Sequence, residues 1–124
     1  MLDRDGIAEM HDLTGRVAIV TGGSRGIGLA VAHAFAAQGA KVVVSSRKAD
    51  ACDEAVAAIR AAGGEALSLP GHAGDLDDLE RLASVTVEAY GGIDVLVNNA
   101  ANPVALPIGG ITPAAFAKSF DVNV

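Results

Sequence analysis

A glycine-rich segment, Thr21-Gly22-Gly23-Ser24-Arg25-Gly26-Ile27-Gly28, has the residue types and spacing of a phosphate-binding turn. It lies between an apolar run and a segment of helical composition. Glycines let the backbone bend tightly and approach a pyrophosphate, and the free amides and dipole of a helix N-terminus favour negative charge. The spacing is Gly-x3-Gly-x-Gly rather than the common Gly-x-Gly-x-x-Gly. A plain strand-to-helix turn would also explain these glycines without any ligand.

Cationic residues follow the next apolar run, in the order Ser45-Ser46-Arg47-Lys48, and no acid comes before Asp50. At this place a carboxylate would bond the ribose 2′-hydroxyl of NAD, whereas an arginine would bind the 2′-phosphate of NADP. Arg47 offers a planar fork, Lys48 a point charge and Ser46 a hydroxyl donor, and Arg25 could join them. The pattern favours NADP(H) over NAD(H), which stays possible. Solvated surface cations are the alternative.

The glycine-rich and cationic segments each lie between a predicted strand and a predicted helix, and such strands and helices alternate along the chain. Short β-branched runs predict strands over 17–20, 41–45, 65–69 and 94–98. Helices are predicted over 27–38, 51–62 and 76–90, and from 112–113 to near the chain end. This alternation predicts an α/β fold with a Rossmann-type, doubly wound parallel sheet. We expect a flexible N-terminal arm over 1–14, and over 15–124 the first portion of one dinucleotide-binding domain, truncated after about four strands.

Composition excludes several classes of protein. The 124 residues are 51% hydrophobic, 3% aromatic and 19% charged, which is unlike a disordered tail. A net charge of −6 and a pI near 4.8 make nucleic acid an unsuitable partner. The single cysteine, Cys52, excludes an internal disulfide, and no metal site is expected. Without a signal peptide or a membrane-spanning run, we expect a cytoplasmic protein with no membrane partner.

A second motif, Asn98-Asn99-Ala100-Ala101, follows the predicted strand over 94–98. Together with the glycine turn it resembles the Thr-Gly-x3-Gly-x-Gly and Asn-Asn-Ala-Gly motifs of the short-chain dehydrogenase/reductase family. The resemblance covers residues 13–124. The residues after the second strand, and His72-Ala73-Gly74-Asp75, are similar to the NADP-linked carbonyl- and retinal-reductase branch.

The resemblance implies a role for each matching position. The glycine turn would hold the phosphates and the adenosine ribose, Ser46 to Lys48 would bind the 2′-phosphate, and Asn99 with Ala100 would line the nicotinamide ribose. Asn98 would tie strands together, and Asp94 would either support the adenine pocket or serve the turn. The implied cofactor-binding residues are Gly22, Ser24, Arg25, Gly26, Ile27, Gly28, Ser46, Arg47, Lys48, His72, Ala73, Asn99 and Ala100.

The resemblance also implies an oxidoreductase that transfers hydride between a nicotinamide and a carbonyl or alcohol. Asn123 matches the asparagine of the family's catalytic tetrad, but the catalytic Ser and Tyr-x3-Lys have no match in these residues. Because proton transfer would need them, we expect the 124 residues to be inactive alone. A longer parent chain would act on a small carbonyl or alcohol and form a homo-oligomer. The alternatives are a non-catalytic NADP(H)-binding module and a truncation product without function.

Overall fold

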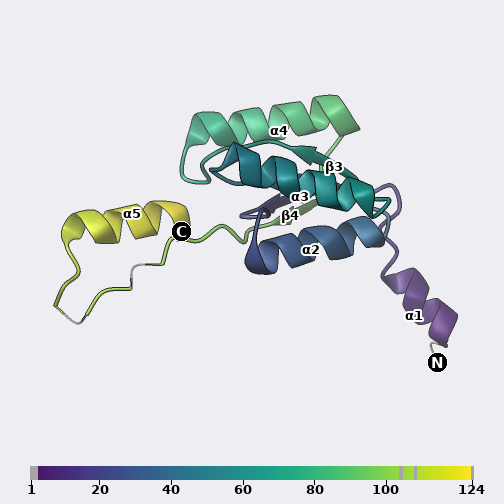
Figure 1. Ribbon diagram of the computed structural model, residues 1–124, viewed down its shortest axis with the longest axis horizontal. Coiled ribbons are helices and arrows are strands. Elements are labelled where there is room, and N and C mark those ends of the chain that lie inside the picture. The colour runs from purple at the N-terminus through teal and green to yellow at the C-terminus, as the bar shows by residue number, and fades with distance from the viewer. Residues whose placement is uncertain (1–2, 104, 108, 124) are drawn as a thin grey trace.

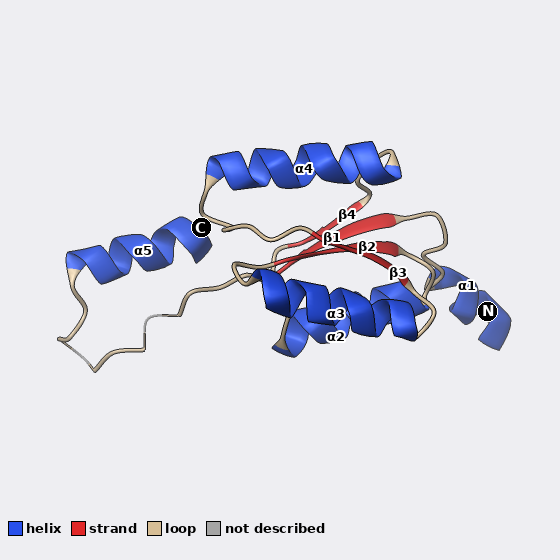
Figure 2. Cartoon of the chain, turned by 45° about the horizontal axis from the view of Figure 1, so that its top comes forward, coloured by secondary structure: helices blue, strands red, loops and turns tan. Residues whose placement is uncertain are grey.

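The computed structural model describes residues 3–103, 105–107 and 109–123. Its centre is a parallel sheet of β1 (Val17–Thr21), β2 (Lys41–Ser45), β3 (Glu65–Ser68) and β4 (Val95–Val97), in the order β3-β2-β1-β4. The α2 helix (Gly26–Ala37) and α3 (Ala49–Ala61) cover one face of this sheet, and α4 (Leu76–Tyr90) covers the other (Figure 2). The predicted α/β fold with a doubly wound parallel sheet is therefore confirmed.

Both faces of the two inner strands are buried. Val42 and Val44 point into the core beneath α2 and α3, while Val43 points toward α4, because successive strand residues alternate between faces. All five residues of β1 are buried. A strand that is covered on both sides needs apolar residues throughout, which explains why these strands are continuous apolar runs rather than alternating patterns.

Local signals at the helix ends keep α4 in place above the sheet. Asp75 caps its N-terminus, since Oδ1 accepts hydrogen bonds from the amides of Asp77 and Asp78. Gly91 ends the helix in the left-handed conformation with φ +85°. The bounds of α4 and of β2 agree with the sequence prediction, whereas the other predicted elements with fixed bounds shift by one or two residues at one or both ends.

The N-terminal arm differs from the sequence prediction. Residues 1–14 were expected to lack regular structure, yet Arg4–Met10 form helix α1, which projects from the body (Figure 1). The Asp3 side chain caps this helix by accepting a 2.8 Å hydrogen bond from the Gly6 amide. None of its residues is buried. Local capping, rather than packing, therefore forms α1.

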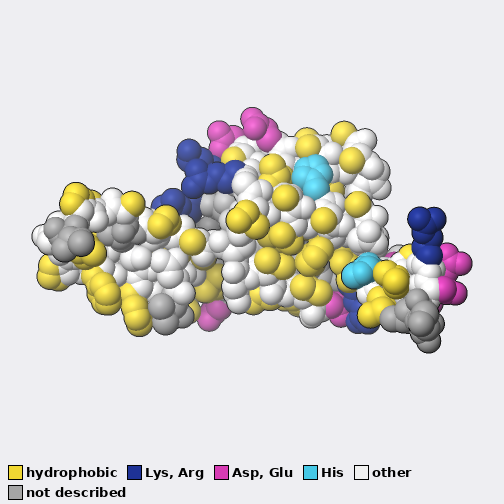
Figure 3. Space-filling view, turned by 90° about the horizontal axis from the view of Figure 1, so that it is seen from below, with side chains coloured by type: hydrophobic (Ala, Val, Ile, Leu, Met, Phe, Trp, Pro, Cys, Tyr) yellow, Lys and Arg dark blue, Asp and Glu magenta, His cyan; other side chains and the backbone are white. Residues whose placement is uncertain are grey.

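The opposite end of the chain also stands apart from the sheet. The described residues between β4 and α5 (Pro113–Asn123) form no further helix or strand, and no described residue of α5 is buried. Residue 124, the last of the predicted final helix, lies outside the described residues. Phe116 and Phe120 stack on each other, and each is more than half exposed. Seen from below, hydrophobic side chains also spread over the middle of the surface (Figure 3). No described helix is long and apolar enough to cross a membrane.

Candidate functional site

A cavity of about 880 Å³ lies at the carboxyl ends of the strands. The turn after β1, the end of β2 and the loops after β3 and β4 all contribute to it, and residues of α4 close one side. Ligands of open α/β sheets bind at this edge. The predicted cofactor-binding residues that line the cavity are Gly22, Ser24, Arg25, Gly26, Ile27, Ser46, Arg47, Lys48, His72, Ala73, Asn99 and Ala100.

The glycine turn needs glycine at specific positions. Gly22 and Gly26 have φ values of +63° and +56°, which side chains rarely adopt. Gly28 does not line the cavity, but a Cβ added there would overlap Gly22 O and Asn99 Nδ2. Arg25 is the N-cap of α2 and makes no side-chain capping hydrogen bond, so the first amides of the helix stay available to an anion.

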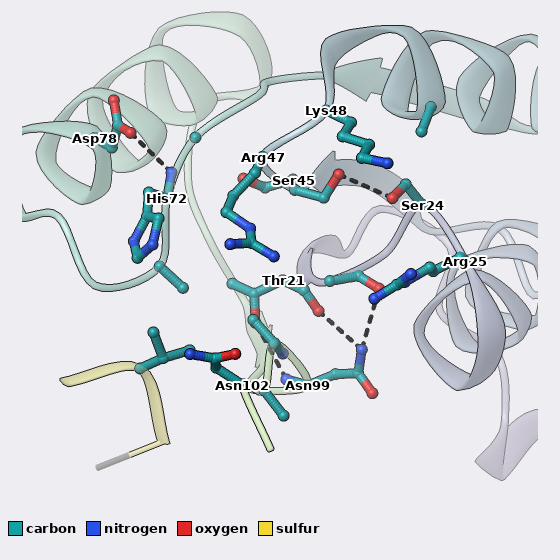
Figure 4. Close-up of a pocket in the computed structure, with 18 of the residues that line it drawn as sticks. Thr21, Ser24, Arg25, Ser45, Arg47, Lys48, His72, Asp78, Asn99 and Asn102 are labelled. Atoms are coloured by element: carbon teal, nitrogen blue, oxygen red, sulfur yellow. Dashed lines mark hydrogen bonds between the residues drawn. The ribbon is translucent and has the colours of Figure 1, made fainter. Parts of the chain in front are cut away.

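Thr21 and Asn99 join the loops after β1 and β4. The Thr21 hydroxyl donates to Val97 O and accepts from the amides of Asn99 and Ala100, each at 3.1 Å. Asn99 Nδ2 donates to the carbonyl oxygens of Thr21 and Gly22, also at 3.1 Å (Figure 4). The prediction that Asn98 ties the strands was therefore wrong, because Asn98 is exposed and Asn99 makes these bonds. Thr21 begins the glycine motif, but the sequence analysis assigned no role to its hydroxyl.

Three cationic side chains border the same cavity. Arg25 comes from the glycine turn, and Arg47 and Lys48 follow β2 (Figure 4). Neither of the ion pairs among the described residues involves them. Next to them, the Ser24 hydroxyl donates to Ser46 Oγ at 2.8 Å. One end of the cavity is therefore polar and positively charged, and it could bind an anionic group.

The loop after β3 is held by α4. Asp78 Oδ2 accepts a 2.8 Å hydrogen bond from the His72 amide, and Asp78 Oδ1 pairs with Arg81 at 2.9 Å. Arg81 also donates to Pro70 O. The hydrogen bond from the His72 amide, followed by that from Arg81, holds the pKa of Asp78 below its ordinary value of 3.8. These contacts fix His72 and Ala73 beside the cavity.

Several cavity residues carried no functional signal in the sequence. Leu79 and Leu82 of α4 line the cavity, although apolar positions at helical spacing predict only core packing. Ala51, Asn102 and Val122 also contribute to the wall. Their membership depends on how the elements are arranged, and no local pattern would have revealed it.

Asp94 lies outside the cavity. Its Oδ2 accepts a 2.8 Å hydrogen bond from the Val17 amide at the start of β1, and Arg16 lies 3.8 Å from its other oxygen. Strand starts lie at the edge of a parallel sheet opposite the carboxyl ends. Asp94 therefore has neither of the two predicted roles, in the adenine pocket or in the turn. It links β1 to the segment before β4 instead.

Asn123 and Tyr90 are not among the residues that line the cavity. Asn123 Oδ1 accepts from the Asn102 amide, and its Nδ2 donates to Asn102 O and to Ser119 Oγ, so it attaches α5 to the loop after β4. Tyr90 lies beneath Lys41 at the start of β2, with Nζ 5.4 Å from the ring centroid. Burial raises the pKa of Tyr90. No group of three His, Cys, Asp or Glu side chains within the described ranges could hold a metal ion.

Comparisons with known proteins agree with this geometry. A family model described as short chain dehydrogenase matches residues 16–124. Dehydrogenase/reductase SDR family member 4 of Homo sapiens is 44% identical over 123 residues, which are 96% of this chain and 43% of that protein. A metagenomic short-chain oxidoreductase solved in complex with NADP is 38% identical, with a TM-score of 0.84 over 91% of this chain and 52% of that one.

A second solved structure is a short-chain type dehydrogenase/reductase from Mycobacterium marinum. It is 32% identical and superposes with a TM-score of 0.91, over 95% of this chain and 48% of the other. The chain thus spans less than half of the human relative's length and about half of each solved structure.

Proposed function

Because the chain belongs to the short-chain dehydrogenase family, we propose that its cavity binds a nicotinamide dinucleotide, with NADP(H) preferred to NAD(H). The chain would form the cofactor-binding part of an oxidoreductase. One observation carries the proposal: the open N-terminus of α2 and the cations Arg25, Arg47 and Lys48 border one cavity at the carboxyl edge of the sheet. The similarity to a solved relative in complex with NADP supports it.

Each wall of the cavity has a part in this proposal. The amides of the glycine turn and of the first residues of α2 would hold the pyrophosphate, where the helix dipole favours negative charge. Arg47, with Lys48 and the Ser46 hydroxyl, would bind the 2′-phosphate, since a guanidinium matches the geometry of phosphate oxygens. His72 and Ala73 would contact the base, and Asn99 and Ala100 the nicotinamide ribose.

The bound nicotinamide would supply hydride transfer to or from a carbonyl or alcohol carbon. Within the 124 residues, the protein's own contribution is binding and orientation, because the one tyrosine, Tyr90 at the end of α4, contacts Lys41 and does not line the cavity. No Tyr-x3-Lys occurs in the sequence. We therefore propose that these residues alone bind the dinucleotide without turnover, and that Asn123 would hold a relay water in an active enzyme.

Binding of NADP⁺ and NAD⁺, measured by isothermal titration calorimetry, tests the preference. Arg47→Ala should weaken NADP⁺ binding by about tenfold or more, as expected for a lost charge-assisted pair, and leave NAD⁺ binding nearly unchanged. Arg4→Ala removes an exposed arginine of α1 and serves as the matched control. An equal loss for both dinucleotides in Arg47→Ala would contradict the assignment of Arg47 to the 2′-phosphate.

A further inference from the structure

The end of the cavity that would receive the base is formed by the loop after β3 and by α4. Since Arg47 and Lys48 would hold the phosphate of the adenosine ribose, the base attached to that ribose must lie beside them, away from Asn99 on the β4 side. Leu79 and Leu82 provide the apolar wall that a flat ring requires. His72 also lines this end of the cavity, and its ring bonds only a backbone amide rather than another side chain.

The hydrogen bonds of the loop fix the tautomer of His72. The Gly74 amide donates a 2.9 Å hydrogen bond to His72 Nδ1, so that nitrogen must carry a lone pair and the ring proton is assigned to Nε2. No described protein group bonds Nε2. His72 therefore presents a hydrogen-bond donor, and no acceptor, to a ligand in the cavity.

Four acceptor atoms near His72 already have one partner each. Both carboxylate oxygens of Asp78 are engaged, Oδ2 by the His72 amide and Oδ1 by Arg81. The carbonyl oxygens of Pro70 and His72 accept from Arg81 and from the Asp75 amide. Each of these oxygens already accepts one hydrogen bond, whereas the Nε2–H of His72 has no hydrogen-bond partner among the described residues.

We propose that the base site recognises a purine by donating a hydrogen bond to an acceptor atom of the purine. It does not select the 6-amino group of adenine. The Nε2–H of His72 can donate to N3 or N7, which are acceptors in both adenine and hypoxanthine. It can also donate to N1 of adenine or to the 6-oxo group of hypoxanthine, so both bases satisfy it. A carboxylate at the same place would instead accept a hydrogen bond from the amino group of adenine and repel the oxo group of hypoxanthine. This inference rests on the proposed dinucleotide binding.

A matched pair of variants isolates the donor. In His72→Asn, Oδ1 can accept from the Gly74 amide in an Asx turn while Nδ2–H replaces the donor. His72→Asp has the same shape and the same turn, but an acceptor replaces the donor. Each protein is titrated calorimetrically with NADP⁺ and with nicotinamide hypoxanthine dinucleotide phosphate. The ratio of the two dissociation constants cancels any general effect of the new charge or of altered stability.

We expect the unsubstituted chain and His72→Asn to bind both dinucleotides within about threefold, and His72→Asp to favour NADP⁺ by about tenfold or more, the size of one charged hydrogen bond. A preference of that size for NADP⁺ in the unsubstituted chain would overturn the inference. Equal ratios in the Asn and Asp variants would also overturn it, because residue 72 would then not face the base. If the unsubstituted chain bound neither of the two dinucleotides, the result would instead contradict the proposed function itself.

Discussion

Asn99 lies 77 residues after Gly22, and its Nδ2 donates a 3.1 Å hydrogen bond to the Gly22 carbonyl oxygen. The same nitrogen bonds the Thr21 carbonyl oxygen at the same distance. One amide thus joins the turn after β1 to the loop after β4, at the edge of the sheet where the cavity lies (Figure 4). The shape of the cavity depends on this link as much as on the sheet.

Asn99→Ala should lower the free energy of unfolding by about 1–3 kcal/mol, because two half-buried carbonyl oxygens lose their donor. Chemical denaturation with urea measures the change. Asn98→Ala is the matched control, since Asn98 is exposed, and it should change the stability by less than about 0.5 kcal/mol. A larger effect for Asn98 than for Asn99 would contradict the observed link.

Gly28→Ala should destabilise the protein although alanine favours helices. An alanine Cβ at this position would overlap Gly22 O and Asn99 Nδ2, and such overpacking costs about 1–3 kcal/mol. Ala30→Gly, on the exposed side of the same helix, reports the ordinary preference for alanine, about 0.5–1 kcal/mol. Thermal unfolding followed by circular dichroism compares the two variants. Stabilisation by Gly28→Ala would show that α2 does not approach the turn this closely.

Asp94→Ala should reduce stability by about 1 kcal/mol, because the Val17 amide loses its acceptor. Asp94→Asn keeps an oxygen acceptor and should retain most of the stability. The NADP⁺ dissociation constant of both variants should stay within about threefold of the unsubstituted chain, since Asp94 lies at the other edge of the sheet. Selective loss of NADP⁺ binding would place Asp94 in the adenine pocket after all.

The lowered pKa of Asp78 predicts a pH-dependent contribution to stability. The His72 amide and Arg81 favour the ionised carboxylate, so the folded-state pKa lies below the ordinary value of 3.8. The contribution is therefore complete above that value and is lost as the pH falls through the folded-state pKa. The stability difference between the unsubstituted chain and Asp78→Asn, measured by urea unfolding, should be constant from neutral pH to about pH 5 and shrink below pH 4. A difference that grows on acidification has the wrong sign.

Where burial and capping act locally, the sequence predicted the fold well. The runs in β1 and β2 are apolar because both faces of these strands are covered, and Asp75 marks the start of α4 with its side chain. By contrast, α1 has no buried face, so it leaves no hydrophobic period to detect. The sequence could identify elements that pack, but not a short helix formed by its cap alone.

The roles of individual site residues were harder to predict from the sequence than the helices and strands. Asn98 and Asn99 are identical neighbours, and only the backbone path after β4 decides which of them reaches Thr21. The contact of Asp94 with Val17 depends on how the strands align, which no local pattern encodes. Leu79 and Leu82 have the spacing of ordinary core residues, and their place at the cavity follows from the packing of α4.

The most direct test of the central claim is a titration of the ¹⁵N-labelled chain with NADP⁺, followed by ¹H–¹⁵N correlation spectra. We predict saturable shifts for amides around the cavity, in 22–28, 46–48, 72–73 and 99–100, and none in α1. NAD⁺ should require higher concentrations for the same shifts. Unchanged spectra, or shifts confined to α1 and α5, would contradict dinucleotide binding at this edge of the sheet.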